Sequence, residues 1–353
     1  MDNDQLAALL PPIAPNAHKY QRGSLLVMGG SKRYVGAAVL AAQAAARTGA
    51  GYVSLAVPDG VEARAQAHLL TVPVIGLPAS AAGDGQSAAF GQSASAAGSG
   101  QPPSAANSNQ QLAASNGQQP SAAAGFPPQA LETLIAQLKH VDAMLYGPGV
   151  LEGQGNQQLL IDCLAAADLP LVLDAGALPL LGQWLQAQRA QPEPQAQGHE
   201  PQSPPPVPPA PPASLALRPS PGSAWTVILT PHAGELAVLL RASGCADAAA
   251  LAKALQAIVV LKGPETVVYH QDGQERSRSG TVGLAKAGSG DVLAGIIASL
   301  LAQGATPGQA AMAGVELHGR AGCQAMAKKS LRAMIARDII EAIPDVLKLV
   351  EGV

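Results

Sequence analysis

A turn of small residues late in the chain, Ala287–Gly290, is followed at once by Asp291 and then by an apolar run with helical spacing. The first turn of a helix leaves backbone N–H groups unpaired, and the helix dipole adds partial positive charge there. Glycines remove the Cβ atoms that would keep a ligand away, so the turn predicts an anion site, such as one for phosphate. Asp291 is either a helix cap or a base acting on a neighbouring hydroxyl, and the stretch alone leaves both readings open.

Other polar or glycine-rich segments follow short apolar runs that predict buried strands. In chain order these segments read GGSKR, GPG, DAG, TPHAGE and KG. In a parallel α/β sheet, ligands bind at the carboxyl ends of the strands. Because so many predicted strands end this way, we expect the segments to meet at one edge of a sheet and to form a single site. The strands are predicted at Ser24–Gly29, Tyr52–Val57, Val72–Leu77, Ala143–Tyr146, Leu169–Leu173, Trp225–Leu229, Ile258–Leu261, Thr266–His270 and Gln274–Arg278.

Helical patterns alternate with these strands, which predicts an α/β fold with a mainly parallel central sheet and helices on both faces. The last helix is expected at about Leu331–Leu347, with Ser330 as its cap. Further helices are predicted at Gly36–Arg47, Val61–Leu70, Gln129–His140, Asn156–Ala167, Leu178–Gln186, Ala246–Gln256 and Pro307–Met326, with one more after His232.

Two stretches differ in composition from the rest of the chain. Residues 79–128 are mostly Ala, Ser, Gly, Gln, Asn and Pro, and residues 187–223 are rich in Pro and Gln. Such segments bury too little apolar surface to offset their ordering entropy, so we expect two disordered insertions. The remaining sequence is expected to form one domain over residues 1–353.

The overall composition narrows the function. The 353 residues carry a formal net charge of −3, without the basic surplus typical of nucleic-acid binding. Cys163, Cys245 and Cys323 are far apart and form no metal or disulfide pattern, which favours a reducing, cytoplasmic location. The N-terminus does not read as a signal peptide, and no apolar run reaches the roughly 20 residues of a membrane span. P-loop, G-x-G-x-x-G and G-x-S-x-G signatures are also missing, which weighs against a P-loop NTPase, an ordinary Rossmann dehydrogenase and an α/β-hydrolase.

A late G-S-G-D turn on such a sheet resembles the ribokinase-like superfamily and, within it, the NAD(P)H-hydrate dehydratases. The TPHAGE and AGSGDVLAG blocks are specific when they occur together. The resembling segments lie at His18–Ser31, Gly36–Pro58, Tyr146–Gly149, Leu171–Leu178, Leu229–Leu240, Leu261–Gly263 and Ala287–Ile297.

This resemblance implies an enzyme that removes water from the S-epimer of hydrated NADH or NADPH. The reaction is driven by ADP, or by ATP, with Mg²⁺ carried by the nucleotide and no protein metal site. The terminal phosphoryl group goes to the hydroxyl of the hydrate and then leaves as phosphate, with AMP as the other product when ADP is used. Asp291 is the implied base. A homo-oligomer, such as a tetramer, is also implied, and the missing epimerase partner implies a stand-alone dehydratase domain.

The resemblance also assigns binding residues. The hydrate is expected to contact Ala37, Gly149, His232 and Asp291. The nucleotide is expected to contact Lys262, Gly263, Pro264, Glu265, Thr266, Gly288, Ser289 and Gly290.

Several of these residues also have ordinary structural readings. Ala37 suits any tight helix start, and Lys262 at a strand end is often a solvated charge. His232 fits the first turn of a helix, and Glu235 is as consistent with capping as with a magnesium or substrate contact. His318 and Cys323 lie on an apolar helix and read as core.

The chain departs from the family pattern at two places. After the middle strand, Gly176 and Pro179 replace an acid and an asparagine of the family's D-A-D-[AG]-L-N pattern, and Thr281-Val282 replaces an Asn-Pro pair before the G-S-G-D turn. Two alternatives therefore stay open. One is a ribokinase-like kinase of a vitamin-like alcohol, which would release a stable phosphorylated product, and the other is a non-catalytic nucleotide-binding protein.

Overall fold

The computed structural model describes residues 1–77, 140–166, 169–190, 217 and 227–352. The insertion predicted at 79–128, most of the one predicted at 187–223, and the helix predicted at Gln129–His140 (except His140) lie outside the described residues. Residues 187–190 are described, and they belong to helix α6 (Ala177–Ala190). The predicted start of the second insertion at residue 187 was therefore wrong, because the helix continues for another turn.

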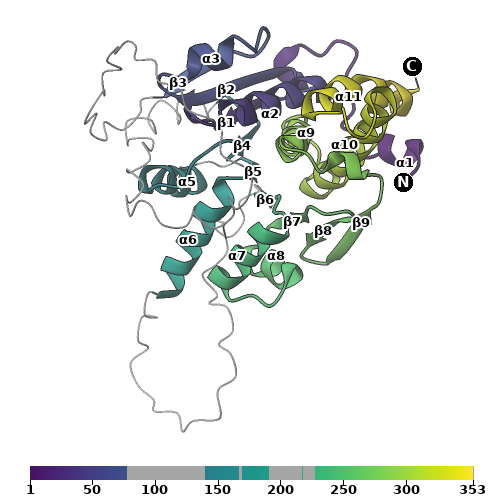
Figure 1. Cartoon of the computed structure of the whole chain (residues 1–353). Helices are drawn as coiled ribbons and strands as arrows, with labels where there is room; N and C mark the ends of the chain where they lie inside the picture. The colour runs from purple at the N-terminus through teal and green to yellow at the C-terminus, as the bar shows by residue number, and fades with distance from the viewer. Residues whose placement is uncertain (78–139, 167–168, 191–216, 218–226, 353) are drawn as a thin grey trace, which may run out of the picture.

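Among the described residues, the centre of the molecule is a nine-stranded sheet in the order β3-β2-β1-β4-β5-β6-β7-β8-β9 (Figure 1). The strands from β3 to β7 are parallel, and β8 and β9 add an antiparallel hairpin at one edge. Each predicted strand is present: β4, β7 and β8 have the predicted bounds, and the ends of the others differ from the prediction by one or two residues. The strands are β1 Ser24–Met28, β2 Tyr52–Pro58, β3 Val74–Leu77, β4 Ala143–Tyr146, β5 Leu171–Leu173, β6 Val227–Leu229, β7 Ile258–Leu261, β8 Thr266–His270 and β9 Gly273–Ser277.

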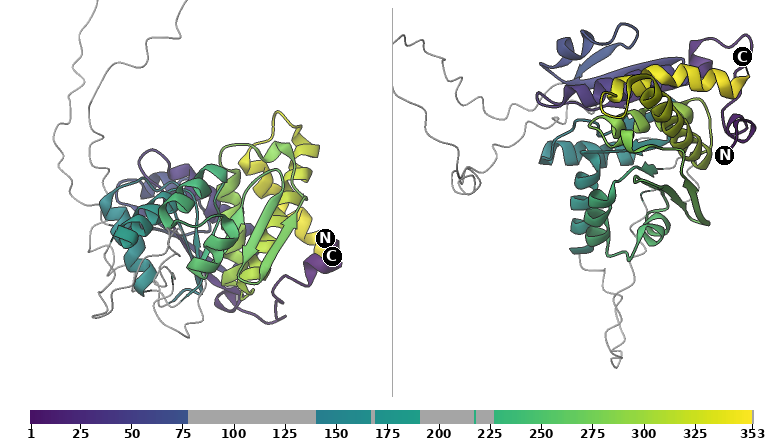
Figure 2. Two further views of the ribbon diagram at one scale, coloured as in Figure 1. Left: turned by 90° about the horizontal axis from the view of Figure 1, so that it is seen from below. Right: turned by 45° about the vertical axis from the view of Figure 1, so that its right-hand side comes forward.

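Helices cover both faces of this sheet, as the alternating pattern predicted (Figures 1 and 2). In β4, Ala143 and Leu145 point into one core, whereas Met144 and Tyr146 point into the other. The first core contains α2, α9, α10 and α11, and the second contains α5, α6, α7 and α8. The helices are α1 Asn3–Ala7, α2 Val35–Thr48, α3 Glu62–Gln66, α5 Gln154–Ala166, α6, α7 Ala233–Ser243, α8 Ala248–Leu255, α9 Ser289–Ala302, α10 Pro307–Lys329 and α11 Ala336–Glu351, with 3₁₀ turns η1 Lys19–Arg22 and η2 Val282–Leu284.

The strand order reverses between β1 and β4. From β1 the chain builds outward to β2 and β3, and it then returns to the other side of β1 with β4. A crevice for ligands forms at such a switch point, outside the carboxyl ends of the two strands. Here the loops after β1 and β4 touch, because the N–H of Gly30 donates to the carbonyl of Pro148 at 2.7 Å.

Helix α9 is buried on all sides from Val292 to Ala302. It packs against α2 on one side and α10 on the other, and two glycines permit this close approach. A Cβ on Gly295 would lie 2.2 Å from the carbonyl oxygen of Ala41 in α2, and a Cβ on Gly314 of α10 would lie 2.5 Å from Ile297 Cγ1. The packing therefore fixes where α9 begins, at the edge where the parallel strands end.

The predicted cap of the last helix was wrong. Ser330 has a φ of +79° and terminates α10, where its N–H donates to the carbonyl of Met326 at 2.8 Å. Helix α11 begins only after Ile335, whose N–H donates to Asp338 Oδ2 at 2.8 Å. The residues between form a turn that buries Met334 beneath Gly283, so tertiary packing moves the helix start toward the C-terminus.

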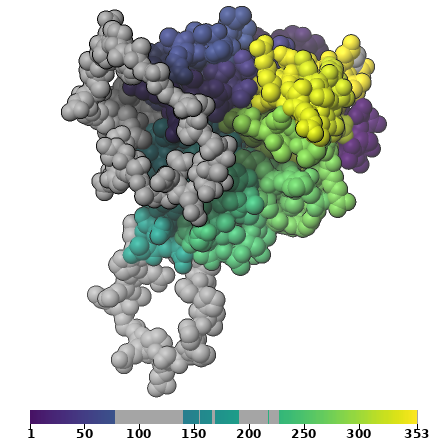
Figure 3. Space-filling model, in the orientation of Figure 1, coloured from purple at the N-terminus to yellow at the C-terminus, as the bar shows by residue number. Residues whose placement is uncertain are grey.

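The two termini lie close together (Figure 2), and Asn3 Nδ2 donates to the carbonyl of Leu349 at 3.2 Å. In the space-filling view, α11 lies on the surface beside α2 and the α9–α10 region (Figure 3). Across the described parts of the chain, no helix has both the length and the apolar character needed to cross a bilayer.

The close contact at Gly295 gives a stability prediction. In Gly295→Ala the added Cβ meets backbone atoms of α2, which cannot rotate away, so we expect the free energy of unfolding to fall by about 1–3 kcal/mol. Gly308→Ala is the matched control, because a Cβ at that position in α10 has no atom within 4 Å. It should leave stability unchanged or raise it by up to ~1 kcal/mol. Urea unfolding of both variants tests this, and an equal effect of the two would contradict it.

Candidate active site

The carboxyl ends of five neighbouring strands, β1, β4, β5, β6 and β7, are joined by four backbone hydrogen bonds beyond the strands themselves. The first residue after each of β4, β5, β6 and β7 donates its backbone N–H to a backbone carbonyl. That carbonyl belongs to the neighbouring strand or to the residues directly after it. The bonds run from Gly147 to Met28 (3.1 Å), Asp174 to Tyr146 (3.1 Å), Thr230 to Leu173 (3.1 Å) and Lys262 to Pro231 (2.8 Å). The predicted motifs therefore do meet at one edge of the sheet, and this series of hydrogen bonds fixes their order.

The turn before α9 has the form expected of an anion site. Gly288 is the N-cap residue with a φ of +88°, and the cap makes no side-chain hydrogen bond. Asp291 is the third residue of the helix and not its cap, so the simple capping role is ruled out. N–H groups in the first turn of a helix lack intrahelical partners. That of Ser289 donates to the carbonyl of Lys286 at 3.2 Å, which leaves those of Gly290 and Asp291. The turn therefore offers donors to an anion, and Asp291 is left available for chemistry.

Lys262 reaches this turn from the end of β7. Its Nζ lies 2.7 Å from Asp174 Oδ1 and 3.8 Å from Glu235 Oε2. A Cβ on Gly290 would lie 3.3 Å from the same Nζ, so the ammonium lies against the anion turn. Thr230 donates a further hydrogen bond of 2.7 Å to Asp174 Oδ1. The solvated-charge reading of Lys262 was therefore wrong, because only 19% of its side chain is exposed.

The charges of this cluster are coupled. Burial raises the pKa of Asp291 to about 7, and the negative charges of Asp174 and Glu235 add to the rise, whereas Lys262 opposes it. Burial disfavours the charged form of Lys262, but Asp174, Glu235 and Asp291 together outweigh it and raise the pKa of the ammonium. Lys262 therefore stays charged near neutral pH, while Asp291 changes its charge there.

His232 and Glu235 form a reciprocal cap at the start of α7. His232 Nδ1 accepts from the N–H groups of Gly234 (3.0 Å) and Glu235 (3.2 Å), and Glu235 Oε2 accepts from the N–H of His232 (2.7 Å). The capping interpretation of Glu235 is thus confirmed, and His232 is the N-cap residue, one position before the first turn in which it was predicted. The His232 side chain is still 61% exposed, and Glu235 also faces Lys262, so capping leaves both at the edge of the site.

Gly149 lies in the crevice between β1 and β4. Its φ is +76°, and a Cβ there would lie 2.2 Å from the carbonyl oxygen of Tyr34. Tyr34 is the N-cap of α2, and Ala37 is the third residue of that helix. Gly36, beside it, has no atom within 4 Å of an added Cβ, so the space in front of the helix start is open. The structure therefore places Gly149 against the N-cap of the helix that carries Ala37, and the role of both residues as hydrate contacts stays a prediction.

The segment predicted to contact the nucleotide runs from Lys262 to Thr266, between β7 and β8. Gly263 and Pro264 are exposed. Glu265 forms ion pairs with Arg278 and, at 2.8 Å, with Arg276, and these hydrogen bonds lower the pKa of its carboxyl. A polar pocket of about 550 Å³ adjoins this pair of arginines. The Glu265 carboxylate is thus already engaged by Arg276 of β9 and by Arg278 just after that strand.

Three polar residues of this region were not predicted from the sequence to belong to the site. Asp174 and Thr230 are buried beside Lys262, and their position directly after predicted strands was a signal that could have identified them. His318 was read as core, and it is buried, but its Nε2 lies 3.1 Å from Ser289 Oγ in the anion turn. No local sequence signal indicated that contact.

One departure from the family pattern has a steric explanation. A Cβ on Gly176 would lie 2.1 Å from the carbonyl oxygen of Val150, in the loop after β4. A side chain at position 176 would therefore push that loop away. Asp174, the acid that remains, is the one that holds Lys262. The missing second acid thus leaves the charge cluster intact.

Metal-binding side chains are not grouped in the described part of this site. The described residues contain no group of three His, Cys, Asp or Glu side chains placed to hold a metal ion.

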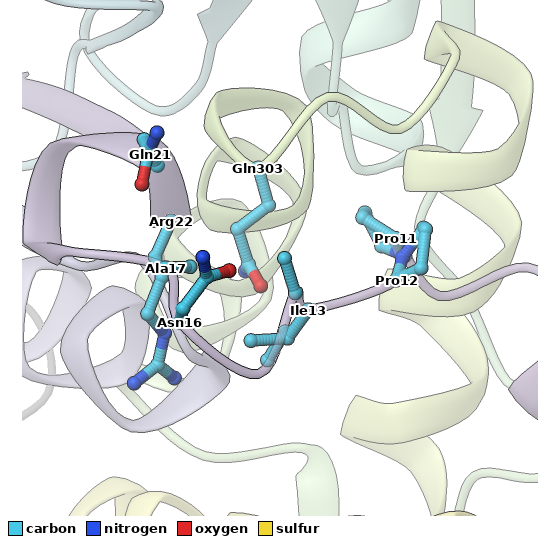
Figure 4. Close-up of a pocket in the computed structure, with 9 residues that line it drawn as sticks. Pro11, Pro12, Ile13, Asn16, Ala17, Gln21, Arg22 and Gln303 are labelled. Atoms are coloured by element: carbon cyan, nitrogen blue, oxygen red, sulfur yellow. The ribbon is translucent and has the colours of Figure 1, made fainter.

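A separate pocket of about 240 Å³ is formed by residues that precede β1 and by Gln303, the C-cap of α9 (Figure 4). It is lined by Pro11, Pro12, Ile13, Ala14, Asn16, Ala17, Gln21, Arg22 and Gln303.

Comparison with known proteins agrees with this geometry. A family model described as NAD(P)H-hydrate dehydratase matches residues 25–100 and 215–345. A bifunctional NAD(P)H-hydrate repair enzyme of Moorella thermoacetica is 31% identical over 97% of this chain and 52% of its own length. The ADP-dependent (S)-NAD(P)H-hydrate dehydratase of Xanthomonas campestris is 30% identical over 96% of this chain and 92% of its own length. The chain thus spans about half the length of the bifunctional relatives.

Solved structures share the fold. The ADP/ATP-dependent NAD(P)H-hydrate dehydratase of Bacillus subtilis, co-crystallised with ATP and Mg²⁺, has a TM-score of 0.64 at 24% identity and covers 99% of this chain and 97% of its own. A ribokinase-like superfamily protein of Enterococcus faecalis has a TM-score of 0.68 at 20% identity, covering 99% and 95%. The predicted ribokinase-like fold is confirmed. By its sequence, the chain belongs to the NAD(P)H-hydrate dehydratase family.

Proposed function

We propose that this chain is a hydro-lyase that restores NADH and NADPH from the S-epimers of their hydrates. In this proposal ADP supplies the driving force and is converted to AMP and phosphate. The family match supports the dehydration, and the name of the Xanthomonas campestris relative supports both ADP and the S-epimer. ATP is the alternative donor, because the Bacillus subtilis protein of the same fold is described as ADP/ATP-dependent.

The observation that carries this proposal is the placement of Asp291. The carboxylate lies one turn from the N-terminus of α9, beside N–H donors suited to a phosphoryl group, and its pKa is raised to about 7. A base with a pKa near the working pH combines a large ionised fraction with good proton affinity. Simple anion binding would gain nothing from an acid at this position, because like charges repel.

The proposed chemistry proceeds in two stages. In the first stage, Asp291 accepts the proton of the hydrate hydroxyl. The hydroxyl oxygen bonds to the terminal phosphorus of ADP, and the bond from that phosphorus to the AMP oxygen breaks. The C–O bond then breaks, phosphate leaves with the electron pair, and loss of a proton from the adjacent ring carbon forms the double bond. The turn at Gly288–Asp291 holds the transferring group, consistent with catalysis by positioning and charge stabilisation.

Mg²⁺ is assigned to the nucleotide and not to a protein cage. Asp174 is hydrogen-bonded to Lys262 and Thr230, and Glu235 caps α7, so these carboxylates are already partnered. Phosphate oxygens and water would supply most ligands of the ion, which is its usual coordination in such sites. When bound, the ion would neutralise charge on the phosphates.

A cytoplasmic homo-oligomer is a further part of the proposal, and its basis is the family resemblance. The three thiols, Cys163, Cys245 and Cys323, are free, which is compatible with a reducing compartment. Size-exclusion chromatography with light scattering of the full chain would test the assembly, and a monomer at micromolar concentration would contradict it.

Recovery of the dihydronicotinamide absorbance band from hydrated NADH tests the activity directly. With Mg²⁺ present, we expect recovery with ADP and none without nucleotide. Parallel reactions with ATP identify the donor. If phosphate is transferred but the band does not return, the protein is a kinase of the same fold. If neither event occurs with folded protein, the proposed activity is wrong.

Asp291→Asn tests the assigned base. The amide has nearly the same size but cannot accept the proton, so we expect turnover to fall by about 10²–10⁴-fold. ADP binding, measured by calorimetry, should persist, because the N–H donors of the turn remain. Near-normal turnover in this variant would remove Asp291 from the mechanism.

The charge cluster predicts how activity depends on pH. Asp291 must be ionised to act as a base, so kcat/KM should fall about tenfold per pH unit below about 7. Lys262→Met removes the charge that lowers this pKa and should move the fall in activity to higher pH. Glu235→Gln removes a charge that raises it and should move the fall to lower pH, while still capping α7 through its amide oxygen. Shifts in the same direction for both variants would contradict this electrostatic account.

A further inference from the structure

His318 makes a hydrogen-bonding contact with the anion turn from a helix that carries no predicted site residue. Its Nε2 lies 3.1 Å from Ser289 Oγ, and both residues are buried, with 8% and 4% of their surfaces exposed. Ser289 is the first residue of α9, within the turn assigned to the phosphoryl group. His318 belongs to α10, so the contact joins two helices at the point where the anion would bind.

Close packing holds the backbone of α10 around His318 in place. A Cβ on Gly319, the next residue, would lie 2.4 Å from Ser279 Oγ, and a Cβ on Gly322 would lie 2.5 Å from Leu284 Cδ2. Helix α10 therefore lies directly against the segment that leads into the anion turn, and the backbone that carries His318 has little room to shift relative to it.

The ring of His318 is neutral at physiological pH. Burial lowers its pKa to about 4, the positive charge of Lys262 acts in the same direction, and a hydrogen bond with the backbone of Ser289 opposes them only in part. A neutral imidazole carries one proton, so Nε2 is either a donor or an acceptor. The state of Nε2 decides what the hydroxyl of Ser289 can do.

A serine hydroxyl has one proton to donate. If Nε2 accepted that proton, Ser289 would present only lone pairs to the anion, and the contact would be repulsive. If Nε2–H donates to Oγ, the hydroxyl proton is free for a phosphate oxygen. We propose that His318 is a positioning residue whose Nε2–H donates to Ser289 Oγ and thereby directs the hydroxyl proton toward the anion held by the Gly288–Asp291 turn. The identification of that anion as the terminal phosphate of ADP rests on the proposed function.

A double-mutant cycle tests whether His318 acts through Ser289. His318→Gln places an amide N–H donor near the position of Nε2, and His318→Leu has similar bulk without a donor. We expect His318→Leu to weaken ADP binding, measured by calorimetry with Mg²⁺, by roughly 10-fold, the effect of losing one hydrogen bond to a charged group. His318→Gln should restore most of that loss. In a Ser289→Ala background, the two substitutions should bind ADP equally.

Several outcomes would overturn the inference. Equal ADP affinity for His318→Gln and His318→Leu in the wild-type background would do so, as would the same difference between them in the Ser289→Ala background. A merely structural role of His318 predicts the same difference in both backgrounds, because such a role does not depend on the hydroxyl of Ser289. If His318→Leu does not fold, His318→Asn replaces it, since the shorter amide retains polarity but does not reach Ser289.

The tautomer can be observed without any ligand. NMR of the protein labelled with ¹⁵N-histidine should show one buried ring in the neutral Nε2–H form, lost in His318→Gln. A charged ring or an Nδ1–H form for that residue would overturn the inference. Failure of the proposed function is distinguishable, because wild-type protein could then bind ADP and show the expected cycle without restoring the dihydronicotinamide band.

Discussion

The ammonium of Lys262 lies among three carboxylates, and its charge balance is the constraint on which the site depends. A buried or half-buried charge is tolerated only when it is paired. Asp174 supplies the closest partner and is itself held by Thr230, while Glu235 and Asp291 add negative charge from the starts of two different helices. Strand ends therefore have to meet helix starts at this edge, or the lysine would be left uncompensated.

The strand ends and helix α9 are positioned by two separate sets of contacts. Hydrogen bonds between the residues that follow β4, β5, β6 and β7 hold the strand ends in a fixed sequence. Helix α9 is positioned independently, by backbone contact with α2 at Gly295 and by packing against α10 at Gly314. Neither set of contacts includes the charged side chains. The backbone contacts and helix packing can therefore hold Asp291 beside Lys262 without relying on the attraction between their side chains.

Much of this arrangement could be predicted from the sequence, since it follows from local patterns. Apolar runs that end in polar motifs predicted the strands, and parallel pairing then required the motifs to share an edge. What escaped prediction depends on contacts distant in sequence. The bond from Lys262 to Asp174 spans 88 positions, and the one from Ser289 to His318 spans 29. Helix ends, such as the start of α11, were displaced by tertiary packing of Met334.

The site also resolves a conflict that the sequence posed, namely an acid at the mouth of an anion site. With a pKa of about 7, Asp291 is partly protonated at neutral pH, which lessens its repulsion of an approaching phosphate. The same shift strengthens it as a base toward a hydroxyl. Lys262 keeps the shift from going further, and a fully neutral acid could accept no proton. Burial of one carboxyl, together with the opposing charges around it, thus reconciles anion binding with proton transfer at a single position.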